Sequence, residues 1–249
     1  MLTPRRRALS ISLTAVALLA AGCTKATVNA APWGAPLDAV TAAAAGLADG
    51  VAFRGVTEAD SVSLATNGEE IPAEHKFRLY QEVSSGVANI ATELRLIGDE
   101  LWMRISGLGG DGDWGHIADG AFLGETADVV GPSVWAPELF AQITTIERIG
   151  EQKYGGVLDL TEADPDRTGI DKAIMRDLPD EAEEVEFSVS LNADGTLNTL
   201  TLEIDDTAQG DVTIDYSFTK HGAPNDVTEP DGKIVEVTDE NAMEWFAGS

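Results

Sequence analysis

Cysteine, histidine and positive charge are all scarce in this sequence, and each shortage argues against a particular structural feature, site or partner. The single cysteine, Cys23, cannot form an intramolecular disulfide, so no disulfide framework holds the fold. The three histidines are scattered, without the short spacing of a metal-binding pair. Only 16 lysines and arginines face 43 aspartates and glutamates, a formal net charge of −27. So acidic a chain repels nucleic acid, and we expect no nucleic-acid partner.

Catalytic motifs and a membrane-spanning run are also missing. No serine lies in a Gly-x-Ser-x-Gly elbow. The acidic turn at residues 164–169 begins as an EF-hand loop does, but its twelfth position is Met175 instead of glutamate, so a helix-capping turn is the better interpretation. We therefore expect no enzyme, no metal site and no cofactor. The apolar run at residues 8–21 is shorter than the ~20 residues that cross a bilayer.

What the N-terminus does contain is a secretory signal. Three arginines, at residues 5–7, precede the apolar run, and small residues lead into Cys23. Small residues before a cysteine resemble the lipobox of bacterial lipoproteins, in which the thiol is lipidated and the preceding peptide is removed. Ala20 occupies the place where most lipoboxes have leucine. The alternative is a plain secretory signal with a chance cysteine. For export, the general secretory route is favoured over the twin-arginine route.

Lipidation at Cys23 predicts where the protein is held. A diacyl thioether together with an N-linked acyl chain such as palmitate gives stable attachment to a membrane. We therefore expect a protein at the extracytoplasmic face of the cell membrane. The predicted organisation is a signal peptide over residues 1–22, a tether over 23–36 and a single domain over 37–249.

Alternating apolar and polar residues dominate the domain and predict half-buried β-strands. Predicted strands cover residues 77–83, 90–96, 101–105, 144–151, 157–160, 185–191, 200–204 and 212–218. Residues 97–100 and 192–195 have the composition of hairpin turns, and the last three strands form a predicted antiparallel meander.

Helical periodicity is confined to a few segments. Predicted helices cover residues 37–47, 135–143 with Pro137 in the first turn, 168–178, and 238–246 with Thr238 as N-cap. Runs of strands with a few segregated helices indicate an α+β fold. We expect a curved antiparallel sheet, a half-barrel, with the helices packed on its concave face.

One face of that sheet collects large apolar side chains. The residues expected to share it, pointing toward the helices, are Leu94, Leu96, Leu101, Met103, Phe187, Val189, Leu202 and Ile214. Such a face must be covered. Either the helices cover it completely and form an ordinary core, or they leave a cavity that a lipid fills. The sequence pattern leaves both open.

Several segments resemble the LppX/LprG group of actinobacterial lipoproteins, whose fold is similar to that of the periplasmic carrier LolA. The segments that carry the resemblance are residues 101–104, 114–117, 154–160, 189–195, 200–202, 216–222 and 227–230. Asn192 departs from the aspartate usual in the hairpin turn, and the chain is unusually acidic.

The resemblance implies a LolA-like curved sheet with acyl chains bound between sheet and helices. It implies binding or transport of a lipid or lipoglycan in the cell envelope, with an envelope transporter or regulator as partner. The alternative is a non-catalytic sensor or interaction module that contacts a membrane-bound regulator. No ligand-binding residue carries over from the group, because such cavities are lined by generic apolar side chains.

Overall fold

The computed structural model describes residues 35–60, 62–85, 89–107, 112–118, 131–165, 167–170, 174–175, 178, 182–207 and 210–238. Cys23, the signal peptide and nearly all of the tether lie outside these ranges. The first strands are β1 (Val51–Ala59), β2 (Val62–Ile71), β3 (Lys76–Ser85), β4 (Asn89–Ile97), β5 (Glu100–Ser106) and β6 (Trp114–Ile117). The later ones are β7 (Ile143–Gly150), β8 (Lys153–Leu158), β9 (Val185–Leu191), β10 (Leu197–Thr207), β11 (Gly210–Thr219) and β12 (Ile234–Glu236).

In the described part of the chain these strands form one large sheet, in the order β12-β6-β5-β4-β3-β2-β1-β11-β10-β9-β8-β7. The sheet is curved, and it is unclosed because its two outermost strands, β12 and β7, do not pair with each other. Every neighbouring pair is antiparallel except β12 and β6, which run parallel. The expectation of a purely antiparallel sheet is therefore wrong at this edge, and the sheet is mixed.

Both predicted hairpin turns are present, and each contains a glycine with a positive φ. Gly98 adopts a positive φ of 62° between β4 and β5. Between β9 and β10, Gly195 has a φ of 88°, and the Asp194 carboxylate accepts hydrogen bonds from the backbone and hydroxyl of Thr196, at 3.1 and 2.7 Å. The meander of β9, β10 and β11 is confirmed.

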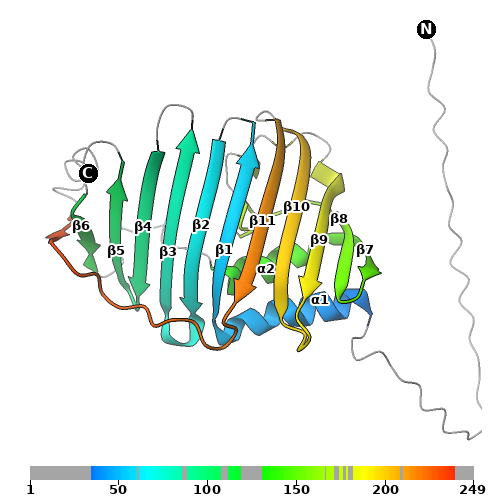
Figure 1. Ribbon diagram of the computed structural model, residues 1–249, viewed down its shortest axis with the longest axis horizontal. Coiled ribbons are helices and arrows are strands. Elements are labelled where there is room, and N and C mark those ends of the chain that lie inside the picture. The colour runs from blue at the N-terminus through cyan, green and yellow to red at the C-terminus, as the bar shows by residue number, and fades with distance from the viewer. Residues whose placement is uncertain are drawn as a thin grey trace, which may run out of the picture. The chain divides into compact units, whose positions relative to one another are not determined.

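Four strands, β1, β2, β6 and β12, were not predicted, and β1 and β12 among them decide how distant parts of the chain join the sheet. β1 pairs with β11 on one side and with β2 on the other, so it joins the N-terminal hairpins to the C-terminal meander. β12 is formed because the chain after β11 returns along the ends of the strands to the far edge, as Figure 1 shows. There it adds to β6 in parallel.

The helices lie on one face of the sheet. The helix α1 (Pro36–Ala45) begins with a proline at its first turn, and Asp38 favours the same end because a helix N-terminus attracts negative charge. It continues as the 3₁₀ turn η1 (Gly46–Asp49). The helix α2 (Pro132–Phe140) follows β6 in the chain, and shorter 3₁₀ turns are η2 (Pro72–Glu74) and η5 (Ala182–Glu184).

Two helix predictions are corrected by the structure. α2 begins at Pro132 and not at residue 135, so Pro137 lies inside the helix instead of in its first turn. Inside a helix a proline has no N–H to donate to the carbonyl four residues back, so α2 lacks one backbone hydrogen bond at Pro137. Residues 168–170 of the helix predicted over 168–178 are bends. Of the remainder of that segment, residues 174 and 175 are helical and residue 178 is not, and the others lie outside the described residues. The terminal helix predicted over 238–246 lies outside the described residues after Thr238.

In Figure 1 the two helices run behind the sheet, and the main core lies between the helices and the strands in front of them. α1 packs on β7, β9 and β10 and also against α2. Val40, Leu47 and Leu139 are completely buried there. Among the described elements, the two helices thus cover the part of the sheet built from β7 to β11.

Candidate functional site

Strand register places all eight predicted apolar residues on the helix-bearing face. Leu94 lies opposite Met103, and Leu96 lies opposite Leu101. Directly paired residues project to the same side of a sheet. Unbroken pairing across β3, β2 and β1 carries that face to β11.

In the other half of the sheet the same face continues. Leu202 lies opposite both Phe187 and Ile214, and Val189 lies opposite Leu200. The geometry brings the eight side chains onto one surface, while their role as a ligand cavity remains a prediction.

Helices fill the space over four of these residues. Phe187, Val189, Leu202 and Ile214 are at most 4 % exposed and belong to the main core. The ring of Phe140 from α2 lies 6.4 Å from that of Phe187, centroid to centroid. This part of the face is a close-packed interior, in which a larger side chain would have no room.

The other four residues lie beyond the described helices. Leu101 is buried with Ile117 and Val237 in a small separate cluster, whereas Leu94, Leu96 and Met103 are only half-buried. We call their surroundings the β3–β5 apolar face. Its members are Leu79, Val83, Ile90, Leu94, Leu96, Met103 and Ile105. Val83 is 38 % exposed, so part of this face is open among the described residues. Leu79 and Leu96 also pack against the edge of the main core. An apolar face that is only partly covered is a candidate site of interaction or ligand binding.

A buried carboxylate, Glu70, marks the border between the covered and the open parts. It is 7 % exposed, on the helix-bearing side of β2. Its side chain accepts hydrogen bonds from the backbone N–H and the hydroxyl of Ser133, at 2.9 and 2.5 Å. Burial raises the pKa of Glu70, and the two bonds from Ser133 partly oppose that shift. Glu70 thereby caps the start of α2, which has no side-chain cap of its own at Gly131.

The opposite, outer face carries a cluster of arginines around one glutamate. Glu93 is 5 % exposed and binds Arg78, Arg95 and Arg104, with nitrogen–oxygen distances of 2.9–3.1 Å. Burial acts to raise the pKa of Glu93, but the hydrogen bond and charge of Arg95, with the charges of Arg78 and Arg104, outweigh it and lower the pKa. Arg95 also donates to the backbone oxygens of Thr228 and Glu229, so the cluster fastens the returning C-terminal segment.

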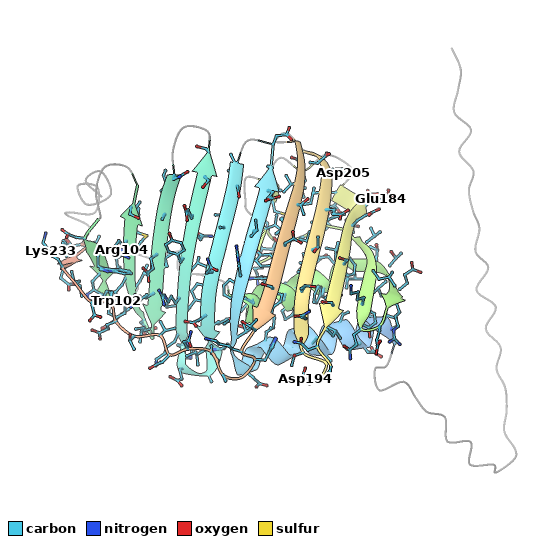
Figure 2. All side chains as sticks on the ribbon, in the orientation of Figure 1. Trp102, Arg104, Glu184, Asp194, Asp205 and Lys233 are labelled. Carbon is cyan, nitrogen blue, oxygen red and sulfur yellow. The ribbon has the colours of Figure 1, made fainter. Side chains whose placement is uncertain are left out.

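Aromatic rings cover the edge of this cluster. Arg95 and Arg104 lie 5.0 and 4.8 Å from the Trp114 ring, and the rings of Trp102 and His116 stack at 4.7 Å. Figure 2 shows Trp102 and Arg104 at one end of the outer face, near Lys233. This cluster was not predicted from the sequence. The feature of the sequence that could have indicated it is the arginines at polar positions of β3, β4 and β5. Alternation alone assigns such positions to solvent.

An open groove of about 620 Å³ lies elsewhere on the outer face, over β7–β10. Its lining residues are Thr145, Ile146, Glu147, Ile149, Gly155, Gly156, Val157, Glu186, Phe187, Ser188 and Glu203. Only Phe187 belongs to the predicted set, so this groove is distinct from the predicted lipid site. Glu186 lies directly opposite Glu203 in the sheet.

The described residues contain no group of three or more histidine, cysteine, aspartate or glutamate side chains placed to hold a metal ion. No helix in the same part of the chain is long and apolar enough to cross a membrane. Chemically, the helix-bearing face offers apolar contact, and the buried carboxylate on it, Glu70, is already hydrogen-bonded by Ser133 of α2.

Fold and face together define an α+β protein with a large, curved, unclosed mixed sheet and helices over part of one side. No family model matches the sequence, and no curated protein matches it. Among solved structures, the chain is similar to a hypothetical protein, CT021, from Chlamydia trachomatis, at 9% identity over 73% of this chain and 92% of that chain. The TM-score of that match is 0.28, which is too low to support an argument about fold or function.

Proposed function

We propose that this protein is a lipid-anchored lipoprotein on the extracytoplasmic side of the cell membrane that binds a hydrophobic, acyl-chain ligand. The observation that supports this best is the β3–β5 apolar face, which continues the core surface beyond the two described helices. The lipobox-like sequence before Cys23 supports the anchor, and the resemblance to the LppX/LprG group supports a LolA-like arrangement of sheet and helices.

An acyl chain suits such a face for a simple reason. Each methylene removed from water contributes about 0.8 kcal/mol, whatever apolar side chains it meets. Leu94, Leu96 and Met103 offer flexible aliphatic contacts without polar groups, so they can accept a chain without specific recognition. The membrane anchor would keep the face near the source of lipid. The proposal contains no catalytic step.

Tryptophan substitutions test this function, because the two parts of the face should respond differently. Leu94→Trp and Met103→Trp should fill the open part, reducing the lipid that co-purifies while changing the thermal midpoint little. Leu202→Trp is the matched control in the filled part. There overpacking should cost about 1–3 kcal/mol. At about 2–4 °C per kcal/mol for a chain of this size, the midpoint should fall by several degrees.

The measurements are native mass spectrometry of protein purified from its own host and thermal unfolding of the same samples. Wild-type protein should retain acyl lipid, and the Leu94→Trp and Met103→Trp proteins should retain much less. Wild-type protein without lipid, or lipid unchanged by both substitutions, would contradict the carrier function. The alternative function is an interaction module whose core is filled. It predicts that no lipid is lost on substitution and that Leu94→Trp lowers the thermal midpoint.

A further inference from the structure

We propose that the C-terminal end of this chain, residues 239–249, docks its apolar side chains on the β3–β5 apolar face and competes there with the ligand. The docking stands independently of the proposed function, whereas the competition rests on it. Three observations on the described residues and the sequence support the proposal.

The first observation is where the described chain ends. Val237 is 6 % exposed and packs with Leu101 and Ile117 on the helix-bearing side of β5 and β6. Its backbone N–H donates to the carbonyl of His116, at 2.8 Å, which fixes the exit point of the chain. Leu94 and Leu96 pack partly against the same cluster. The chain after Thr238 therefore starts at the border of the open apolar face.

The second observation is the composition of the segment. Apolar side chains occur at Ala242, Met243, Trp245 and Phe246. At helical spacing these four lie on one stripe, and Glu240 and Glu244 lie on the opposite side. A segment with two aromatic rings and a methionine is a costly one to leave in water, because each such side chain gains about 1.5–3 kcal/mol on burial.

The third observation is that the reach fits. Nine residues of helix extend about 13 Å, at 1.5 Å per residue. Val237 follows β12, which lies two strands from β5, so reaching β5 requires about 10 Å, since neighbouring strands lie about 4.8 Å apart. A helix that leaves Val237 would therefore cover Met103 on β5 and end beside Leu94, the directly paired residue on β4.

Disulfide trapping tests the docking. In the full-length chain carrying Cys23→Ser, Met103→Cys is combined with Met243→Cys or with Phe246→Cys. The matched control replaces Met103→Cys with Ser106→Cys, which lies on the same strand but projects to the outer face. Mild oxidation should link the tail to position 103 and not to position 106. Equal linkage at both positions, or none at position 103 with either tail cysteine in a protein that unfolds cooperatively, would overturn the docking.

Palmitate binding tests the competition. Trp245→Ala with Phe246→Ala, in an otherwise wild-type chain, should strengthen binding of added palmitate by about fivefold or more, a common size of coupling between sites. Glu240→Ala with Glu244→Ala, on the polar side of the same segment, is the control and should leave binding unchanged. Equal palmitate affinity in both double variants would overturn the competition. Absence of palmitate binding in every protein would overturn the proposed function and the competition together, while the disulfide result would still decide the docking.

Discussion

At the scale of single residues, two buried glutamates on opposite faces of the sheet have opposite environments. Glu70 is buried and, among the described residues, is hydrogen-bonded by Ser133, so burial dominates and its pKa is raised. Glu93 meets three guanidinium groups, which together outweigh burial and lower its pKa. The same side chain therefore favours the folded state in different pH ranges on the two faces.

Glu70 should stabilise α2 in the manner of an N-cap. Glu70→Ala removes the acceptor for Ser133, and the loss of such a cap typically costs about 0.5–2 kcal/mol. Glu70→Gln should cost less, because the amide oxygen can still accept one bond. Urea unfolding at neutral pH measures both, and the exposed Glu58→Ala serves as control. A Glu70→Ala protein as stable as Glu58→Ala would show that Ser133 needs no partner.

Glu93 should make the protein sensitive to acid. Because the pKa of Glu93 is lowered on folding, its contribution is present above the unfolded value of 4.5 and is lost as pH falls through the lower folded value. Glu93→Gln should lower the free energy of unfolding at neutral pH by about 1.5–3 kcal/mol, the range for hydrogen bonds to charged groups. It should then lose less stability than wild type as the pH falls below 4.5. Parallel pH profiles for the two proteins would disprove this role.

At the scale of elements, the strands closest to the helices depend on glycine where two chains approach. A Cβ on Gly156 of β8 would lie 1.9 Å from the carbonyl oxygen of Thr145 in β7. At Gly46, which follows α1, an added Cβ would have no neighbouring atom within 4 Å, and φ is a helical −65°. The two positions make a matched pair, because alanine at position 156 would clash with backbone and alanine at position 46 would contact no other atom.

Gly156→Ala should separate β7 from β8 and destabilise the protein, since backbone cannot move aside as a side-chain tip can. The lost pairing should appear as faster hydrogen exchange in β7. Gly46→Ala should be neutral or stabilising by up to about 1 kcal/mol, because alanine restricts the unfolded chain and favours helix. A Gly156→Ala protein with wild-type exchange in β7 would contradict this account.

At the scale of the whole molecule, the predicted anchor and the described sheet are separate parts of the chain. Contacts divide the chain into residues Met1–Pro32 and residues Trp33–Ser249, and all described residues belong to the second unit. The fold should therefore be indifferent to what happens at Cys23.

Cys23→Ala should abolish membrane attachment and signal cleavage before residue 23, and it should leave the thermal midpoint of the domain unchanged. Membrane fractionation and the intact mass of the wild-type protein measure the first effect, and thermal unfolding measures the second. Wild-type protein without added acyl mass, together with normal membrane partitioning of the Cys23→Ala protein, would refute the lipoprotein prediction.

Alternation was enough to predict the strands whose two faces differ. β3, β4, β5 and β9–β11 were each recognised because one side is apolar and the other polar, and a single shift of register would expose the apolar side. Alternation failed for β1 and β2. There Gly55 and Gly68 replace apolar side chains, leaving room for Tyr216 and Phe53 of neighbouring strands, and Glu70 stands on the inner side.

The sequence by itself therefore determined the phase of the strands that it predicted: the apolar side chains at Leu94, Met103, Leu202 and Ile214 do share one face. It could not determine which of them the helices cover, because that depends on where α1 and α2 pack across the sheet. Nor could it reveal the arginine cluster at Glu93, whose members come from three strands and meet only when the sheet forms. Those features are long-range contacts, and only the tertiary structure brings their partners together.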